Sequence, residues 1–151
     1  MIFQRLSRTD PERVFVVVRN TEGSALPANT CVNWETASAS LDGVAVRQPD
    51  TGQAYLFAGV VDAQIAAADY GLLQVYGYRS SGVALYQSGT SIDTGAAVVA
   101  SAGVGYAVTV ATTVAASDAV TLHVIPMVLA ESVQTVAASA TTAKKVFIRA
   151  L

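Results

Sequence analysis

The side chains that most often do chemistry in proteins are few in this sequence. Its 151 residues include one histidine, His123, and one cysteine, Cys31. A Ser–His–Asp triad would need Asp118 or Asp93 to orient His123, together with a serine on a sharp turn. The chain has no Gly-x-Ser-x-Gly pattern. We therefore interpret His123 as a strand histidine that hydrogen-bonds a neighbour, and we expect no enzyme activity.

Metal and cofactor sites are also not indicated. One cysteine and one histidine cannot build a four-cysteine or two-cysteine, two-histidine zinc site, and a lone cysteine forms no intramolecular disulfide. Cys31 lies between Thr30 and Val32 without a visible cationic neighbour, so we predict a buried structural thiol. The segment 102–105 lacks the third glycine of a dinucleotide-binding loop. The acidic residues lie singly, mostly in turns, rather than as a catalytic pair.

The charge balance excludes two classes of protein. Nine Lys and Arg stand against eleven Asp and Glu, so no basic field exists to bind nucleic acid. The hydrophobic content of 52% excludes a disordered chain. Residues 94–117 carry no charge, but they are rich in Thr, Ser and Gly and contain no Leu or Phe. We therefore expect no membrane span, and no cleaved signal peptide at the N-terminus.

The dominant period along the chain is two residues, which is typical of β-strands. Residues 104–114 place bulky side chains on one face and small ones on the other, and 120–128 repeat this pattern. Further strands are expected at 14–19, 30–35, 43–48, 55–61, 72–78, 83–87, 96–101, 133–138 and 144–150. Turn sequences such as Ser80-Ser81-Gly82 separate many of them. Only 62–68 and 9–13 have short helical character.

This pattern predicts an all-β single domain, a β-barrel or β-sandwich with antiparallel strands and little helix. We expect residues 1–13 to form an N-terminal arm and residues 14–151 the β domain. The region 94–143 has only two charged residues, which favours a surface buried against a partner over a merely neutral one. The self-association candidates on its bulky strand face are Val104, Tyr106, Val108 and Val110.

Aromatic residues suggest a second type of surface. Tyr76 and Tyr78 fall on one face of their expected strand. Either this pair or Trp34 could form a stacking platform for sugars, although core or interface packing is the commoner use of such residues.

Three segments resemble small β-rich virion proteins of tailed bacteriophages, and the second of them is most similar to capsid decoration, or cement, proteins. They are Val14-Phe15-Val16-Val17-Val18-Arg19-Asn20, the stretch from Ala58-Gly59-Val60-Val61 to Gln74-Val75-Tyr76-Gly77-Tyr78, and the closing Lys144-Lys145-Val146-Phe147-Ile148-Arg149-Ala150-Leu151. The resemblance implies a protein that binds the outer surface of the phage head and strengthens the shell. It carries no catalytic motif and transfers no functional residues.

The resemblance also implies partners and a location. Such proteins bind the major capsid protein, commonly as homotrimers, so the chain is expected on the outer surface of the virion after synthesis in the host cytoplasm. We expect the N-terminal arm to reach the capsid, with apolar side chains entering a groove and arginines pairing with carboxylates. The capsid-contact candidates are Ile2, Phe3, Arg5, Leu6, Arg8 and Arg13. The alternatives are another phage structural part, such as a head fibre base, neck or tail component, and a carbohydrate-binding module on the virion.

Overall fold

The computed structural model describes residues 12–36, 43–49, 56–85, 97–100, 108–110, 127–129 and 141–150, and these residues form an all-β protein without a helix. The nine strands in these ranges are β1 (Arg13–Asn20), β2 (Cys31–Trp34), β3 (Ala45–Arg47), β4 (Phe57–Val61), β5 (Tyr70–Leu85), β6 (Ala97–Ala100), β7 (Val108–Val110), β8 (Met127–Leu129) and β9 (Thr141–Arg149). They join in one sheet in the order β1-β3-β2-β4-β5-β9-β8-β6-β7. In this part of the chain no helix has the length and hydrophobicity needed to cross a membrane.

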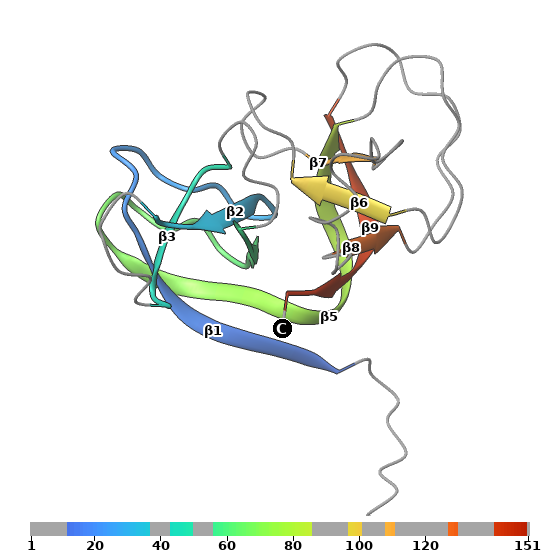
Figure 1. The fold of residues 1–151 in the computed structure, drawn as a ribbon, viewed down its shortest axis with the longest axis horizontal. Helices are drawn as coiled ribbons and strands as arrows, with labels where there is room; N and C mark the ends of the chain where they lie inside the picture. Colours follow the sequence, from blue (N-terminus) through green and yellow to red (C-terminus); the bar gives the residue numbers. More distant parts are fainter. Residues whose placement is uncertain are drawn as a thin grey trace, which may run out of the picture.

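Five of the strands close into a barrel, which confirms the expected fold class. β1 pairs with β3 at one edge and with β5 at the other, so the order β1-β3-β2-β4-β5 returns to its start. Figure 1 shows β1 and β5 running side by side, with β2 and β3 on the opposite wall. The barrel pairs are antiparallel except β1 with β3, which are parallel over Arg19 and Asn20. The long-range pairing of β1 with β5 therefore selects a barrel rather than a sandwich.

Apolar side chains of the barrel strands, together with two turn residues, form the hydrophobic core. The buried core cluster consists of Val18, Leu26, Val32, Val46, Ala58, Val61, Ile65, Leu73 and Val75. Each fully buried Val, Leu or Ile side chain stabilises the fold by about 2 kcal/mol relative to its exposed state. Leu26 and Ile65 lie in the two turns at one end and form an isolated antiparallel bridge, with backbone hydrogen bonds of 2.9 and 3.0 Å. This bridge ties the two turns together at that end of the core.

β5 is long enough to belong to two parts of the structure. Its first residues pair with β1 and β4 in the barrel, and its later residues pair with β9. β9 continues through β8 and β6 to β7, which curls back toward β5. Figure 1 shows these strands beside the barrel, at the right of the view. One bent strand therefore couples the barrel to the rest of the sheet.

Two local expectations from the sequence are wrong. The alanine-rich segment 62–68 is not helical, because Ile65 bridges to Leu26 and Ala68 has a positive φ of 62°. Tertiary pairing overrides the weak helix preference of a short alanine run. The sequence Ser80-Ser81-Gly82 is not a turn between two strands. It lies inside β5, where the register with β9 shifts between Arg79 and Gly82. The expected turn is thus an irregularity of one long strand.

Gly77 holds the start of β1 against β5. Its φ is 101°, a conformation that residues with a Cβ rarely adopt. A Cβ at this position would also collide with the carbonyl oxygen of Glu12. Arg13 is the register partner of Gly77, so the first residue of β1 sits directly on this glycine.

We predict that Gly77→Ala lowers the free energy of unfolding by at least about 2 kcal/mol, because it adds both backbone strain and a clash with backbone atoms. Chemical denaturation of both proteins measures this change. Gly23→Ala is the matched control. A Cβ on Gly23 meets nothing within 4 Å, so its effect should stay within about 0.5 kcal/mol. Equal effects of the two substitutions would contradict the role given to Gly77.

Candidate docking surfaces

The structure describes only some of the residues singled out from the sequence. Ile2, Phe3, Arg5, Leu6 and Arg8 lie outside the described residues, as do Val104, Tyr106 and His123. Arg13 is the first residue of β1 and is exposed. Val108 and Val110 lie in β7, the last strand in the sheet order, and pair with Ala100 and Val98 of β6.

The thiol of Cys31 is buried, as the sequence predicted. Cys31, Val60 and Gln74 are cross-strand partners in a row over β2, β4 and β5, and all three are buried. Burial raises the pKa of the Cys31 thiol to about 12, although the nearby Arg79 guanidinium partly opposes this shift. A thiol with such a pKa is inert at neutral pH. Within the described ranges, no three His, Cys, Asp or Glu side chains gather as metal ligands.

Arg79 is the centre of a buried polar cluster that sequence reasoning missed. Its side chain is 8% exposed. The guanidinium pairs with the Asp62 carboxylate at 3.1 Å and donates to the Asn29 side-chain oxygen at 3.1 and 2.6 Å. It also donates to Gln74 Oε1 at 3.0 Å and to the backbone oxygens of Val61 and Asp62 at 3.1 and 3.3 Å. All three guanidinium nitrogens therefore donate within the protein, which indicates a structural role rather than a ligand site.

Gln74 links this cluster to the bend in β5. Its side-chain nitrogen donates to the backbone oxygens of Tyr76 and Tyr78, both at 3.2 Å. These carbonyls flank Gly77, where β5 leaves regular strand geometry. The side-chain amide of Gln74 thus stabilises the bend through its nitrogen and accepts from the Arg79 guanidinium through its oxygen.

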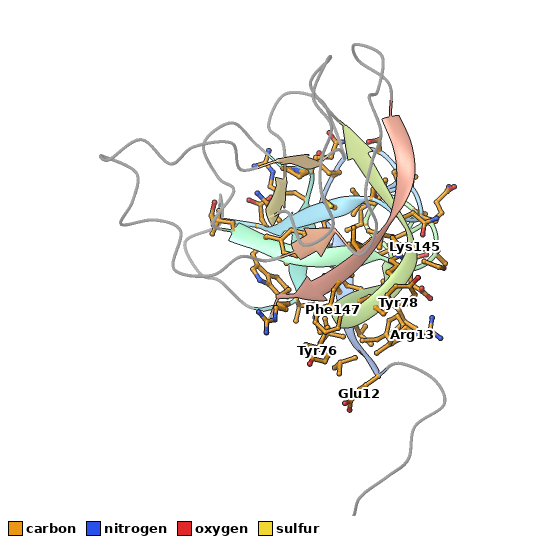
Figure 2. All side chains as sticks on the ribbon, turned by 90° about the vertical axis from the view of Figure 1, so that its right-hand side faces the viewer. Glu12, Arg13, Tyr76, Tyr78, Lys145 and Phe147 are labelled. Atoms are coloured by element: carbon orange, nitrogen blue, oxygen red, sulfur yellow. The ribbon has the colours of Figure 1, made fainter. Side chains whose placement is uncertain are left out.

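Three aromatic residues gather where β5 pairs with β9. Tyr78 is the register partner of Phe147, and the rings of Tyr76 and Phe147 pack edge to face, with centroids 5.4 Å apart and an interplanar angle of 80°. Figure 2 shows these three side chains together, with Glu12 and Arg13 of the chain entering β1 beside them. All three rings are half-buried. Trp34, the other aromatic residue singled out from the sequence, is half-buried and packs against the barrel core.

A separate apolar strip lies on the outer wall of the barrel. The three large hydrophobic side chains that remain exposed in the described residues are Val17 (60%), Tyr70 (60%) and Leu72 (46%). Val17 on β1 is the register partner of Leu72 on β5. Tyr70 lies two residues before Leu72, on the same face of β5, and is the register partner of Arg19. We call Val17, Tyr70 and Leu72 the apolar strip. The sequence predicted a strand over 14–19 but not which of its three consecutive valines, 16–18, would face outward.

We predict that Arg79→Met lowers the free energy of unfolding by about 3 kcal/mol, because it leaves the carboxylate of Asp62 and several buried acceptors without their donor. Urea denaturation measures the loss. Arg19→Met is the control, since Arg19 is exposed, and its replacement should change the free energy by less than about 0.5 kcal/mol. If both variants unfold at the same urea concentration, the Arg79 cluster does not contribute to the stability of the fold.

The stability of the protein should also fall with pH above about 9, the ordinary pKa of a cysteine thiol. In this range the unfolded chain loses the Cys31 proton while the folded chain keeps it, so alkaline pH favours unfolding. We expect Cys31→Ala to show a shallower loss of unfolding free energy between pH 9 and 10.5. Titrations of both proteins in urea at several pH values test this. Identical slopes would show that the thiol is not buried in the folded state.

No protein-family model matches this chain, and no curated protein matches it either. Function therefore has to be argued from the surfaces themselves. The described residues offer a closed barrel, an internally satisfied arginine cluster, an apolar strip and an aromatic cluster at the start of β1.

Proposed function

We propose that this protein is a capsid decoration protein of a tailed bacteriophage, which binds the outer surface of the head and stabilises the shell. It acts by docking and needs neither a cofactor nor a reaction. The observation that carries this proposal is the apolar strip, the exposed patch of Val17, Tyr70 and Leu72 on the wall of a closed barrel.

The position of the strip supports docking to a protein. Single exposed hydrophobic residues are common on any surface. Here two of the three are directly opposite each other on paired strands, and the third follows on the same face. Contiguous apolar surface of this kind commonly marks an interaction site. The opposite face of the same strands packs the barrel core through Val18 and Leu73, so the strip is presented on a stiff wall.

A rigid support matters for a protein that strengthens a shell. The barrel closes on itself through β1 and β5, and the Arg79 cluster fastens β5 to the turns that flank β2 and β4. Such a body loses little conformational entropy when it binds, which favours tight docking. This argument supports a reinforcing role over a flexible linker role.

We further propose that the protein works as a homotrimer that self-associates through the charge-poor region 94–143. The support is the low charge of that region and the place of Val108 and Val110 in β7, the end strand of the described sheet. Three chains of 15.6 kDa would give a solution mass of about 47 kDa by light scattering. A six-chain ring would favour the neck or tail alternative instead.

Docking through the strip predicts that Val17→Lys weakens binding to expanded phage heads at least about tenfold, because a charge on the strip would be desolvated on contact. The heads are assembled from the major capsid protein of the phage proposed to encode this chain, and co-sedimentation measures bound protein against concentration. Ala63→Lys is the matched control, since Ala63 is an exposed residue outside the strip. It should bind like the unchanged protein.

Two outcomes would overturn the proposal. If the unchanged protein does not co-sediment with the heads, it is not a decoration protein of that phage. If Val17→Lys and Ala63→Lys bind equally well, the apolar strip is not the docking surface. A glycan-binding screen run in parallel distinguishes the carbohydrate-module alternative, for which the aromatic cluster would be the binding surface.

A further inference from the structure

The fold brings the start of β1 and the end of β9 to one place. Three basic residues belong to these two strand ends: Arg13, Lys145 and Arg149. Arg13 at the start of β1 is opposite Gly77 of β5, and Gly77 is opposite Ile148 of β9. The start of β1 and the end of β9 therefore flank the same residue of the same strand.

The aromatic cluster lies at this meeting point. Tyr76 is the register partner of Arg149, and Tyr78 is the partner of Phe147. Residues 145, 147 and 149 alternate with the buried Val146 and Ile148, so they share the outer face of β9. We call Arg13, Tyr76, Tyr78, Lys145, Phe147 and Arg149 the basic–aromatic face; Figure 2 labels all of these except Arg149, together with Glu12.

The arginines of this face differ from those elsewhere in the protein. Arg47 is held by Glu22 and Glu35 at 3.6 Å, and Arg79 is held by Asp62 at 3.1 Å. Arg13 and Arg149 form no ion pair with another residue of the described ranges, and both are exposed. The face carries three of the nine basic residues, Arg13, Lys145 and Arg149, in a chain whose net charge is −2. Among the described residues, Glu12 lies beside it.

We infer that the basic–aromatic face binds a carboxylate-rich protein segment. Exposed guanidinium groups pair with carboxylates through two parallel hydrogen bonds, and they do so more strongly beside apolar side chains that exclude water. Tyrosine and arginine are also among the residues that contribute most to the binding energy of protein interfaces. The net negative charge of the whole chain makes nucleic acid a poor partner.

The ring geometry favours a protein segment over an acidic polysaccharide. Sugars stack on flat aromatic faces, whereas Tyr76 and Phe147 are nearly perpendicular to each other. This inference deepens the proposed function and rests on it for the identity of the partner: on a phage head, the acidic segment belongs to the outer surface of the shell. The binding chemistry itself can be tested without heads.

The test uses the full chain and a short fluorescein-labelled peptide of Glu, Asp and Leu, with binding followed by fluorescence anisotropy. A peptide with Gln and Asn in place of the acids is the uncharged probe. We expect the acidic peptide to bind, the uncharged peptide to bind at least about tenfold more weakly, and binding to weaken as salt is added.

Charge reversals then locate the site. Arg149→Glu and Arg13→Glu should each weaken binding of the acidic peptide about tenfold. Arg19→Glu is the matched control, because it makes the same change in net charge at an exposed residue on the opposite end of β1. It should weaken binding less than about twofold. Thermal unfolding of each variant confirms that the fold is kept.

Three results would overturn the inference: no binding of the acidic peptide, equal loss in Arg19→Glu and Arg149→Glu, or binding of polygalacturonate without binding of the peptide. The outcome is separable from that of the proposed function. If the protein binds the acidic peptide but not the heads, the face does bind acidic segments, and the capsid is rejected as its partner. Head binding that survives both Arg149→Glu and Arg13→Glu would keep the decoration role and reject this face as its contact.

Discussion

The buried guanidinium of Arg79 is the interaction on which the rest of the structure depends. It lies on the part of β5 that pairs with β9, and its acceptors lie in the barrel, at Asn29, Val61 and Asp62. A buried charge costs several kcal/mol unless it is paired and hydrogen-bonded throughout. The barrel turns can therefore occupy only the positions that present these acceptors. One side chain sets how the later half of β5 leaves the barrel.

The bend of β5 at Gly77 determines which residues come together in the basic–aromatic face. With Gln74 holding the carbonyls on both sides of it, β5 turns while its backbone remains hydrogen-bonded. The start of β1 packs on Gly77 from one side, and β9 pairs with it from the other. The start of β1, the end of β9 and the three aromatic rings meet there as a result. The basic–aromatic face is thus a consequence of the bend rather than a feature of any single strand.

Strand positions were largely predictable because the alternation of apolar and small residues is local. β1, β2, β4 and β9 lie close to the expected ranges. The failures have non-local causes. Ile65 is drawn into a bridge with Leu26 from a distant turn, which prevents the helix expected at 62–68. The serines at 80 and 81 are kept in strand by pairing of β5 with β9, although their composition is typical of a turn.

For the proposed binding surfaces, too, the local features were predictable from the sequence and the contacts between strands were not. The sequence identified Tyr76, Tyr78 and Arg13 as candidates, but as separate elements: two tyrosines on a strand and an arginine in an arm. It gave no sign that Val17, among three consecutive valines, would be the exposed one opposite Leu72. The outward face of a strand is known only once its register with the neighbouring strand is fixed.

The sequence by itself determined an all-β chain with an inert cysteine, few charges and no visible catalytic constellation, because these follow from composition and from a period of two residues. Only the tertiary structure decided that the strands close into a barrel, that Arg79 is buried among its acceptors, and that the start of β1 and the end of β9 converge on Gly77. Each of these depends on contacts between residues far apart in the chain. Local propensity carries no information about such contacts, whereas burial and hydrogen bonding in the folded state select them.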